Sequence, residues 1–222
     1  MPASLISFSV EYKCLFFVTI GLSLIILSKS DSSNPINLKH SLGVRYLHFV
    51  FPLAQFLYCP ECGSSHFEVN NEKSKKCADC GFVYYFNPSA ATVALILNEK
   101  NELLVCRRAK EPAKGTLDLP GGFIDMNETG EEGVAREVLE ETGLKVKKAI
   151  YQFSLPNIYV YSGFPVHTLD MFFLCTVEDM SHFSAMDDVA DSFFLPLSEI
   201  HPEDFGLDSI RRGLSLFLAQ CR

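Results

Sequence analysis

Runs of apolar residues, separated by short polar turns, divide the second half of the chain into strands. Ala91–Leu97 is apolar at almost every position, which is typical of a strand that is buried on both faces. A polar turn at 98–101 separates it from a second expected strand over Glu102–Arg107. Similar runs predict strands over Thr168–Thr176 and Ser192–Leu197. A sheet is therefore the expected centre of this region.

Two segments have helical rather than strand-like spacing. The first covers about Thr129–Thr142 and is followed by Gly143, a typical residue just past a helix end. The second covers about Asp208–Gln220, with apolar residues on one face and Asp208 as the expected N-cap. Strands interleaved with these helices predict an α/β fold, an α/β/α sandwich around a mixed sheet over residues 89–222.

Four cysteines in two pairs precede this region. Cys59 and Cys62 form one CxxC pair, and Cys77 and Cys80 form the other after fourteen intervening residues. Each CxxC turn directs two thiolates to one point, and four thiolates suit a tetrahedral, structural Zn²⁺ site. The alternative of a redox-active pair needs a thioredoxin-like βαβ setting, which the sequence does not show.

The segment around the cysteines is expected to fold as a zinc ribbon over residues 53–88. His66–Val69 is the predicted first strand, 70–73 a turn, and Tyr84–Phe86 the returning strand. A module of this size has too little core to fold without its metal. Asn87 and Pro88 mark its boundary with the following domain.

Composition and net charge indicate a folded domain and argue against one class of partner, nucleic acid. Hydrophobic residues make up 48% of the 222 residues and charged residues 21%, which allows a packed core. The net charge of −8, from 19 Lys and Arg against 27 Asp and Glu, argues against a nucleic-acid-binding surface. With only eight cysteines and a metal-like spacing, we expect a cytoplasmic protein rather than a disulfide scaffold.

Residues 1–52 form an N-terminal extension with an apolar run from Cys14 to Leu27. The run is shorter than the roughly 20 residues that span a bilayer, so we do not expect a membrane protein. Three interpretations stay open: a dispensable or wrongly extended start, a membrane-associated leader, and a helix that packs on the enzyme. All the candidate chemistry follows from Cys59 onwards.

The helix over 129–142 has an unusual charge pattern. Glu137, Glu140 and Glu141 lie at positions i, i+3 and i+4 and therefore share one face. Like charges at this spacing repel, and carboxylates in a last turn oppose the helix dipole. A bound divalent cation turns the repulsion into coordination, and hard carboxylate oxygens favour Mg²⁺ or Mn²⁺.

At this point the sequence resembles a known family. Gly122, Glu128 and the run from Arg136 to Leu144 match the Nudix box, GX5EX7REUXEEXGU, at every specified position. The resemblance covers about Ala91 to the C-terminus. A four-cysteine ribbon directly before the domain is similar to the zinc-ribbon branch of Nudix enzymes, which includes NADH pyrophosphatases.

The resemblance implies a hydrolase that cleaves a nucleoside diphosphate linked to another moiety, by attack of water on phosphorus. By position, Glu137 and Glu141 correspond to the main metal ligands and Glu140 to a third. The carbonyl of Gly121 corresponds to a further ligand, and Arg136 to a residue that orients a box glutamate. The metal neutralises pyrophosphate oxygens and activates water.

The general base is left open by the resemblance, because it varies within the family. Glu140 is one candidate. The other candidates are three acids in a late loop, Asp187, Asp188 and Asp191.

Substrate-binding residues are less clearly marked. The tryptophan-containing array of NADH pyrophosphatases is missing, since the chain has no Trp, and Phe153–Pro165 stands in its place. Its aromatic residues Tyr159, Tyr161 and Phe164 either stack on a base or simply pack.

Four basic residues precede the glycine pair and either contact phosphates or remain solvated: Arg107, Arg108, Lys110 and Lys114. Arg108 is the candidate we single out for substrate binding.

The leading interpretation is a Mg²⁺-dependent Nudix pyrophosphohydrolase with a structural zinc ribbon and a nucleotide-type small-molecule substrate. One alternative is a pyrophosphatase of NADH or of NAD-capped RNA. Another is a Nudix-derived regulator that senses a ligand without hydrolysing it, which the complete glutamate set disfavours. A homodimer is left open.

Overall fold

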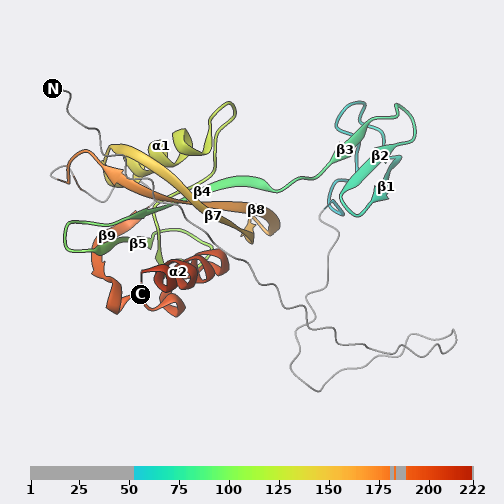
Figure 1. Cartoon of the computed structure of the whole chain (residues 1–222). Helices are drawn as coiled ribbons and strands as arrows, with labels where there is room; N and C mark the ends of the chain where they lie inside the picture. Colours follow the sequence, from blue (N-terminus) through green and yellow to red (C-terminus); the bar gives the residue numbers. More distant parts are fainter. Residues whose placement is uncertain (1–52, 181–182, 184–188, 222) are drawn as a thin grey trace, which may run out of the picture. The chain divides into compact units, whose positions relative to one another are not determined.

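The computed structural model of the chain describes residues 53–180, 183 and 189–221 (Figure 1). The N-terminal extension, with its run from Cys14 to Leu27, lies outside the described residues, as do the base candidates Asp187 and Asp188. Within the described part of the chain, every helix is too short or too polar to span a bilayer.

The cysteine-rich segment forms a small three-stranded antiparallel sheet. Its strands are β1 (Phe67–Asn71), β2 (Ser74–Cys77) and β3 (Val83–Tyr85), in the order β1-β2-β3. Tyr84–Phe86 was predicted as the returning strand, and β3 covers most of it, but a further strand lies between it and β1. This strand is β2, whose short polar sequence Ser-Lys-Lys-Cys has little strand propensity of its own, and β3 pairs with β2.

The following domain contains two further three-stranded sheets. One is mixed, in the order β4-β8-β7, because β4 is parallel to β8 and β7 is antiparallel to it. The other is antiparallel, in the order β6-β5-β9. The strands are β4 (Ser89–Ile96), β5 (Glu102–Arg108), β6 (Leu117–Asp118), β7 (Val146–Tyr161), β8 (Phe164–Val177) and β9 (Val189–Pro196).

Two helices cover opposite faces of these strands, α1 (Gly130–Thr142) and α2 (Asp208–Gln220), as Figure 1 shows. Neighbouring residues of one strand face different helices: Leu95 joins the core under α2, and Ala94 joins the core under α1. Phe172 and Phe173 of β8 divide between the two cores in the same way. Both faces of these strands are covered where the two cores meet them, and the expected sandwich is confirmed.

Both helices lie where they were predicted, but the expected N-cap of α2 differs. Helix α2 begins at Asp208 itself, with Leu207 as its N-cap and no side-chain cap. The expected capping role of Asp208 was therefore wrong. Its carboxylate instead pairs with Arg211 and Arg212 one turn along the helix, at 3.6 and 3.4 Å. Two short 3-10 turns, η1 (Leu197–Glu199) and η2 (Pro202–Asp204), connect β9 to α2.

The longest strand, β7, was not predicted as a single element. It contains Pro156, which lacks an N–H to donate, and a bulge between Tyr151 and Phe153. Both are tolerated because β7 lies at the edge of its sheet. Through this strand, the aromatic stretch of the sequence lies beside β8.

Candidate active site

Helix α1 is held by its caps, so that its glutamates have fixed positions. Thr129 and Glu132 form a reciprocal capping box at its start. Gly143 ends it in a left-handed conformation, with φ of 70°, and donates its N–H to Leu139. Val134 and Val138 are fully buried under the sheet. The face with the glutamates is thereby turned toward the loop before the helix.

The glycine pair 121–122 brings the backbone of this loop close to the glutamates. The Gly121 N–H donates to Glu141 Oε2 at 3.0 Å. A Cβ at Gly121 would lie 2.1 Å from the Thr92 carbonyl oxygen, and its φ of 147° is one that few other residues adopt. At Gly122, a Cβ would lie 2.6 Å from the Glu137 carboxyl carbon. Glycine is therefore required at 121 by the Thr92 backbone and by its own conformation, whereas at 122 it leaves room for the Glu137 carboxylate.

Arg136 connects the carboxylates around the start of the site. Its Nε donates to Glu128 Oε1 at 2.8 Å, and its Nη1 donates to Glu137 at 2.7 Å and to Glu140 at 3.1 Å. Its Nη2 donates to the Phe123 carbonyl at 2.9 Å. This is the geometry expected of a residue that orients box glutamates.

The carboxylates around Arg136 differ in their surroundings. The hydrogen bond from Arg136 lowers the pKa of Glu128. Burial raises the pKa of Glu137, although Arg136 opposes that effect. Glu137 is thus a partly desolvated acid next to the glycine pair, an environment in which a cation would favour the charged form.

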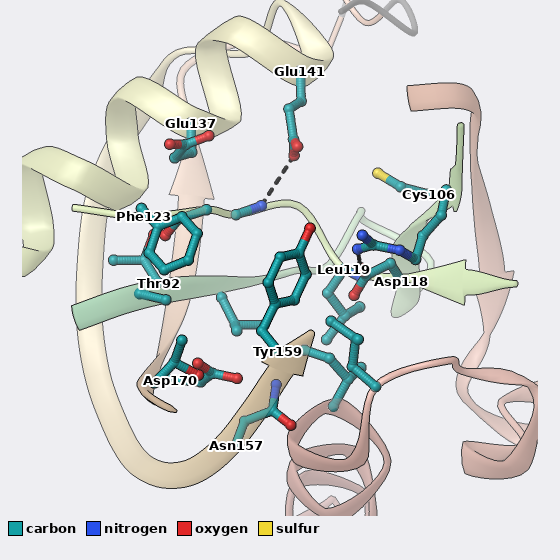
Figure 2. Close-up of a pocket in the computed structure, with 18 of the residues that line it drawn as sticks. Thr92, Cys106, Asp118, Leu119, Phe123, Glu137, Glu141, Asn157, Tyr159 and Asp170 are labelled. Atoms are coloured by element: carbon teal, nitrogen blue, oxygen red, sulfur yellow. Dashed lines mark hydrogen bonds and ion pairs between the residues drawn. The ribbon is translucent and has the colours of Figure 1, made fainter. Parts of the chain in front are cut away.

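A cavity of about 440 Å³ lies below α1, between the two sheets of the domain (Figure 2). Glu137 and Glu141 line it, together with Gly121, but Glu140 does not. Figure 2 shows the two glutamates on one side of the cavity and Asn157 and Asp170 on the opposite side. The geometry therefore separates Glu140 from the other two acids of the same helix face.

Aromatic rings occupy the middle of the cavity. Tyr159 and Tyr161 of β7 line it, and the Phe123 ring meets the Tyr159 ring edge-on with centroids 6.1 Å apart. Phe164 lies elsewhere, because its ring packs against Phe56 and Phe86 at 5.8 and 5.9 Å. Two of the three aromatic candidates are thus placed where a base could stack on them.

Arg108 lines the cavity but is already engaged. Its guanidinium donates to Asp118 and to the Pro112 carbonyl, and it lies 5.9 Å from the centre of the Tyr159 ring. Burial raises the pKa of Asp118, although Arg108 opposes that effect. Arg108 therefore lines the cavity while it also holds Asp118 and lies over the Tyr159 ring.

The other basic candidates are dispersed. Arg107 and Lys110 line the cavity, and Arg107 also donates to the Gly115 carbonyl at 2.8 Å. Lys114 is not among the lining residues.

The candidates for the general base include Asp191, the one acid of the late loop that the structure describes. Asp191 lies exposed in β9, opposite Arg107. It is not a lining residue of the cavity.

Sequence reasoning missed a set of polar residues in the cavity wall: Asp118, Asn157, Thr168 and Asp170. Asp170 and Thr168 are 5% and 4% exposed, within a strand that consists mostly of apolar residues. Polar residues at positions i and i+2 of an apolar strand share one face, and this signal could have identified them.

The four cysteines form a second candidate centre. Their sulfur atoms lie within 4.8 Å of one another, with Cys59 and Cys80 3.7 Å apart and Cys62 and Cys77 3.6 Å apart. Disulfide sulfurs lie about 2.05 Å apart. Zn–S bonds of about 2.3 Å at tetrahedral angles place sulfurs about 3.8 Å apart. The spacing thus fits four thiolates around one metal ion.

Among the four cysteines, the thiolate form is favoured at Cys77. The backbone N–H of Cys80 donates to Cys77 Sγ at 3.5 Å, and this bond is the largest of several hydrogen bonds that lower the pKa of Cys77 to about 6. Among the described residues, the box carboxylates do not form a comparably tight group of three.

Comparison with known proteins identifies the family to which the domain is similar. The model of the NUDIX domain matches residues 87–214. The NAD-capped RNA hydrolase NudC of Vibrio parahaemolyticus is 31% identical over 122 residues, which cover 55% of this chain and 45% of that protein. The ADP-ribose pyrophosphatase of Methanocaldococcus jannaschii is 44% identical over 75 residues, 33% of this chain and 44% of that protein.

Solved structures agree on the fold. A NUDIX hydrolase from Nitrosomonas europaea superimposes with a TM-score of 0.58 at 24% identity, covering 73% of this chain and 90% of that one. A MutT NUDIX hydrolase from Burkholderia pseudomallei superimposes with a TM-score of 0.50 at 20% identity, covering 61% of this chain and 99% of that one. The chain spans less than half the length of the two curated relatives described above.

Proposed function

Because the chain belongs to the Nudix family, we propose that it hydrolyses the pyrophosphate bond of a nucleoside diphosphate linked to another moiety. The observation that carries this proposal is the joint placement of Glu137, Glu141 and the glycine pair at one end of a cavity that contains aromatic rings. The cavity offers a metal-binding end for phosphates and an aromatic region for a base.

The donor set at the first end fits Mg²⁺ or Mn²⁺. Glu137, Glu141 and the Gly121 carbonyl would hold the ion, since all three supply hard oxygen atoms. When bound, the ion neutralises phosphate oxygens and lowers the pKa of coordinated water. Glu140 is a weaker candidate as a ligand because it lies outside the cavity, on Arg136.

The protein's own residues would orient the reactants. Arg136 fixes the Glu137 carboxylate at 2.7 Å, and the Gly121 N–H fixes Glu141 at 3.0 Å. The Tyr159 ring, supported by Arg108, offers a face for a base. Such preorganisation is a main source of rate acceleration in phosphoryl transfer.

The ribbon over residues 53–88 is proposed to hold one structural Zn²⁺ through Cys59, Cys62, Cys77 and Cys80. Four cysteine ligands close the coordination shell, which leaves no position for a substrate. The module therefore contributes stability and not hydrolysis.

Substrates with an adenosine diphosphate end are the first to test. The relatives described above are named as acting on ADP-ribose and on NAD-capped RNA, and both contain such an end. The ribbon favours the NAD-related alternative. The experiment is a screen of ADP-ribose, NADH, NAD-capped RNA and sugar-linked nucleoside diphosphates with Mg²⁺, with products separated by chromatography.

The matched control in that screen is Glu141→Gln, which is nearly isosteric and removes one carboxylate. We expect it to abolish hydrolysis without lowering the melting temperature, because it also relieves repulsion with Glu137 one turn away. Near-normal turnover in this variant at saturating Mg²⁺ would contradict the metal-ligand assignment. Failure to cleave any substrate would contradict the proposed function.

A further inference from the structure

A polar floor of the cavity, formed by Asn157, Thr168 and Asp170, lies across from the glutamates (Figure 2). The Thr168 side-chain oxygen is buried, and among the described residues it has no hydrogen-bond partner. A buried hydroxyl without a partner is costly and uncommon in native structures. Thr168 also lines the cavity, so its missing partner is to be sought in a bound ligand.

Strand register places the three residues on one face. Asn157 of β7 pairs directly with Thr168 of β8. Paired residues of antiparallel strands point to the same side, and Asp170 follows Thr168 by two positions on that side. The floor is thus a single surface of three hydrogen-bonding side chains.

Asp170 is fixed in this surface by the second helix. The Ser209 hydroxyl, in the first turn of α2, donates to Asp170 Oδ2. This bond ties the Asp170 side chain to the first turn of α2. The bond to Ser209 occupies one oxygen of Asp170. The buried hydroxyl of Thr168, two residues earlier on the same face, gains no partner from this contact.

Charge decides which part of a nucleotide can occupy the floor. The Asp170 carboxylate disfavours a phosphate at this end, whereas a cation between Glu137 and Glu141 would favour one at the other end. Tyr159 lies between the two ends and offers a stacking surface (Figure 2). A base at the floor and phosphates at the glutamates is the arrangement consistent with these charges.

We propose that Asn157, Thr168 and Asp170 bind the amino-bearing edge of the substrate's nucleobase. This inference rests on the proposed function and names the base-recognition residues of the same cavity. The Asp170 carboxylate accepts an N–H of the exocyclic amino group, and the Thr168 hydroxyl bonds to the neighbouring ring atom. Adenine, guanine and cytosine share this chemistry, whereas hypoxanthine and uracil lack the amino group.

The test measures binding rather than hydrolysis. Nucleoside monophosphates, which contain no pyrophosphate bond, are titrated into the full chain with Mg²⁺ by calorimetry in matched pairs: AMP against IMP, GMP against IMP, and CMP against UMP. We expect about 10- to 100-fold tighter binding of the amino-bearing member in at least one pair, as for a hydrogen bond to a charged group. Equal affinities in all pairs, or no binding at all, would overturn the proposal.

Thr168→Val is the diagnostic variant, because it keeps the shape and removes the unpaired hydroxyl. We expect an unchanged or higher melting temperature and a loss of about 10-fold in affinity for the preferred monophosphate. Asp170→Asn provides a second variant that should reduce the amino preference. Thr176→Val, at an exposed position of the same strand outside the cavity, is the matched control.

The two proposals can fail separately. Base selectivity that survives in both Thr168→Val and Asp170→Asn would contradict base recognition by these residues, without contradicting the proposed hydrolysis. Selective binding of monophosphates by a chain that cleaves no pyrophosphate would support the floor and overturn the proposed function.

Discussion

Replacing Arg136 with methionine should destabilise the domain, because this side chain joins carboxylates that otherwise repel one another. Arg136 donates to Glu128, Glu137 and Glu140 and to the Phe123 carbonyl. Methionine keeps most of the aliphatic stem and a good helix propensity, so packing and backbone effects are small. The change therefore isolates the hydrogen bonds and the charge.

The magnitude follows from the exposure of the side chain. Removing one partner of a buried ion pair costs about 3–5 kcal/mol. The Arg136 side chain is 25% exposed, so solvent screens part of the interaction. We expect a loss of about 2–4 kcal/mol in the free energy of unfolding after this discount.

The assay is urea unfolding at neutral pH without Mg²⁺, followed by far-ultraviolet circular dichroism. Arg212→Met is the matched control, because Arg212 has an exposed ion pair with Asp208 at 3.4 Å. It should change stability by no more than about 0.5 kcal/mol. A loss below about 1 kcal/mol for Arg136→Met, or equal losses in the two variants, would show that Arg136 does not hold these carboxylates together.

The pH dependence provides an independent check on the same network. Arg136 lowers the pKa of Glu128, so the native chain binds this proton less tightly than the unfolded chain does. That contribution to stability is present above the ordinary glutamate pKa and is lost as pH falls through the lowered value. The stability gap between the unchanged protein and Arg136→Met should therefore narrow in acid.

Three further predictions concern the glycine pair, the ribbon and the N-terminal extension. Gly122→Ala should lower kcat by about 10²-fold, because its Cβ would lie 2.6 Å from the Glu137 carboxyl carbon; steady-state kinetics showing normal kcat would contradict this. Cys62→Ser should lose zinc by metal analysis and increase hydrogen exchange in residues 59–88 while the domain stays folded; retained zinc would argue against the site. A chain starting at Phe51 should remain soluble and keep both zinc and activity, and aggregation of that chain would identify the removed segment as a packed element.

Local sequence patterns were sufficient for the elements whose determinants lie close together in the chain. Helix α1 follows from the spacing of its glutamates and from Gly143, because i, i+4 spacing and helix termination involve only neighbouring residues. The four-sulfur cluster likewise follows from two CxxC turns, once a hairpin brings them together. Strands buried on both faces were recognisable from continuous apolar runs.

Edge and cap positions were predicted less well, since the alternatives are close in energy. β7 contains Pro156, which sequence rules exclude from central strands, and only its place at the sheet edge makes it acceptable. Asp208 is a good N-cap residue, but the helix starts one residue earlier than a capping role requires. Both outcomes depend on neighbours that the local sequence does not specify.

Helical spacing alone places three glutamates on one face, and the two CxxC turns alone allow four cysteines to meet. Which of the glutamates line the cavity depends on how α1 is rotated against the sheet, and packing turns Glu137 and Glu141 into it but not Glu140. The polar floor of the cavity likewise depends on tertiary packing. Asn157 and Thr168 meet through pairing of β7 with β8, and Asp170 is fixed by Ser209 from a helix 39 residues away in sequence. Contacts of that range are set by packing of whole elements, which no periodicity along the chain records.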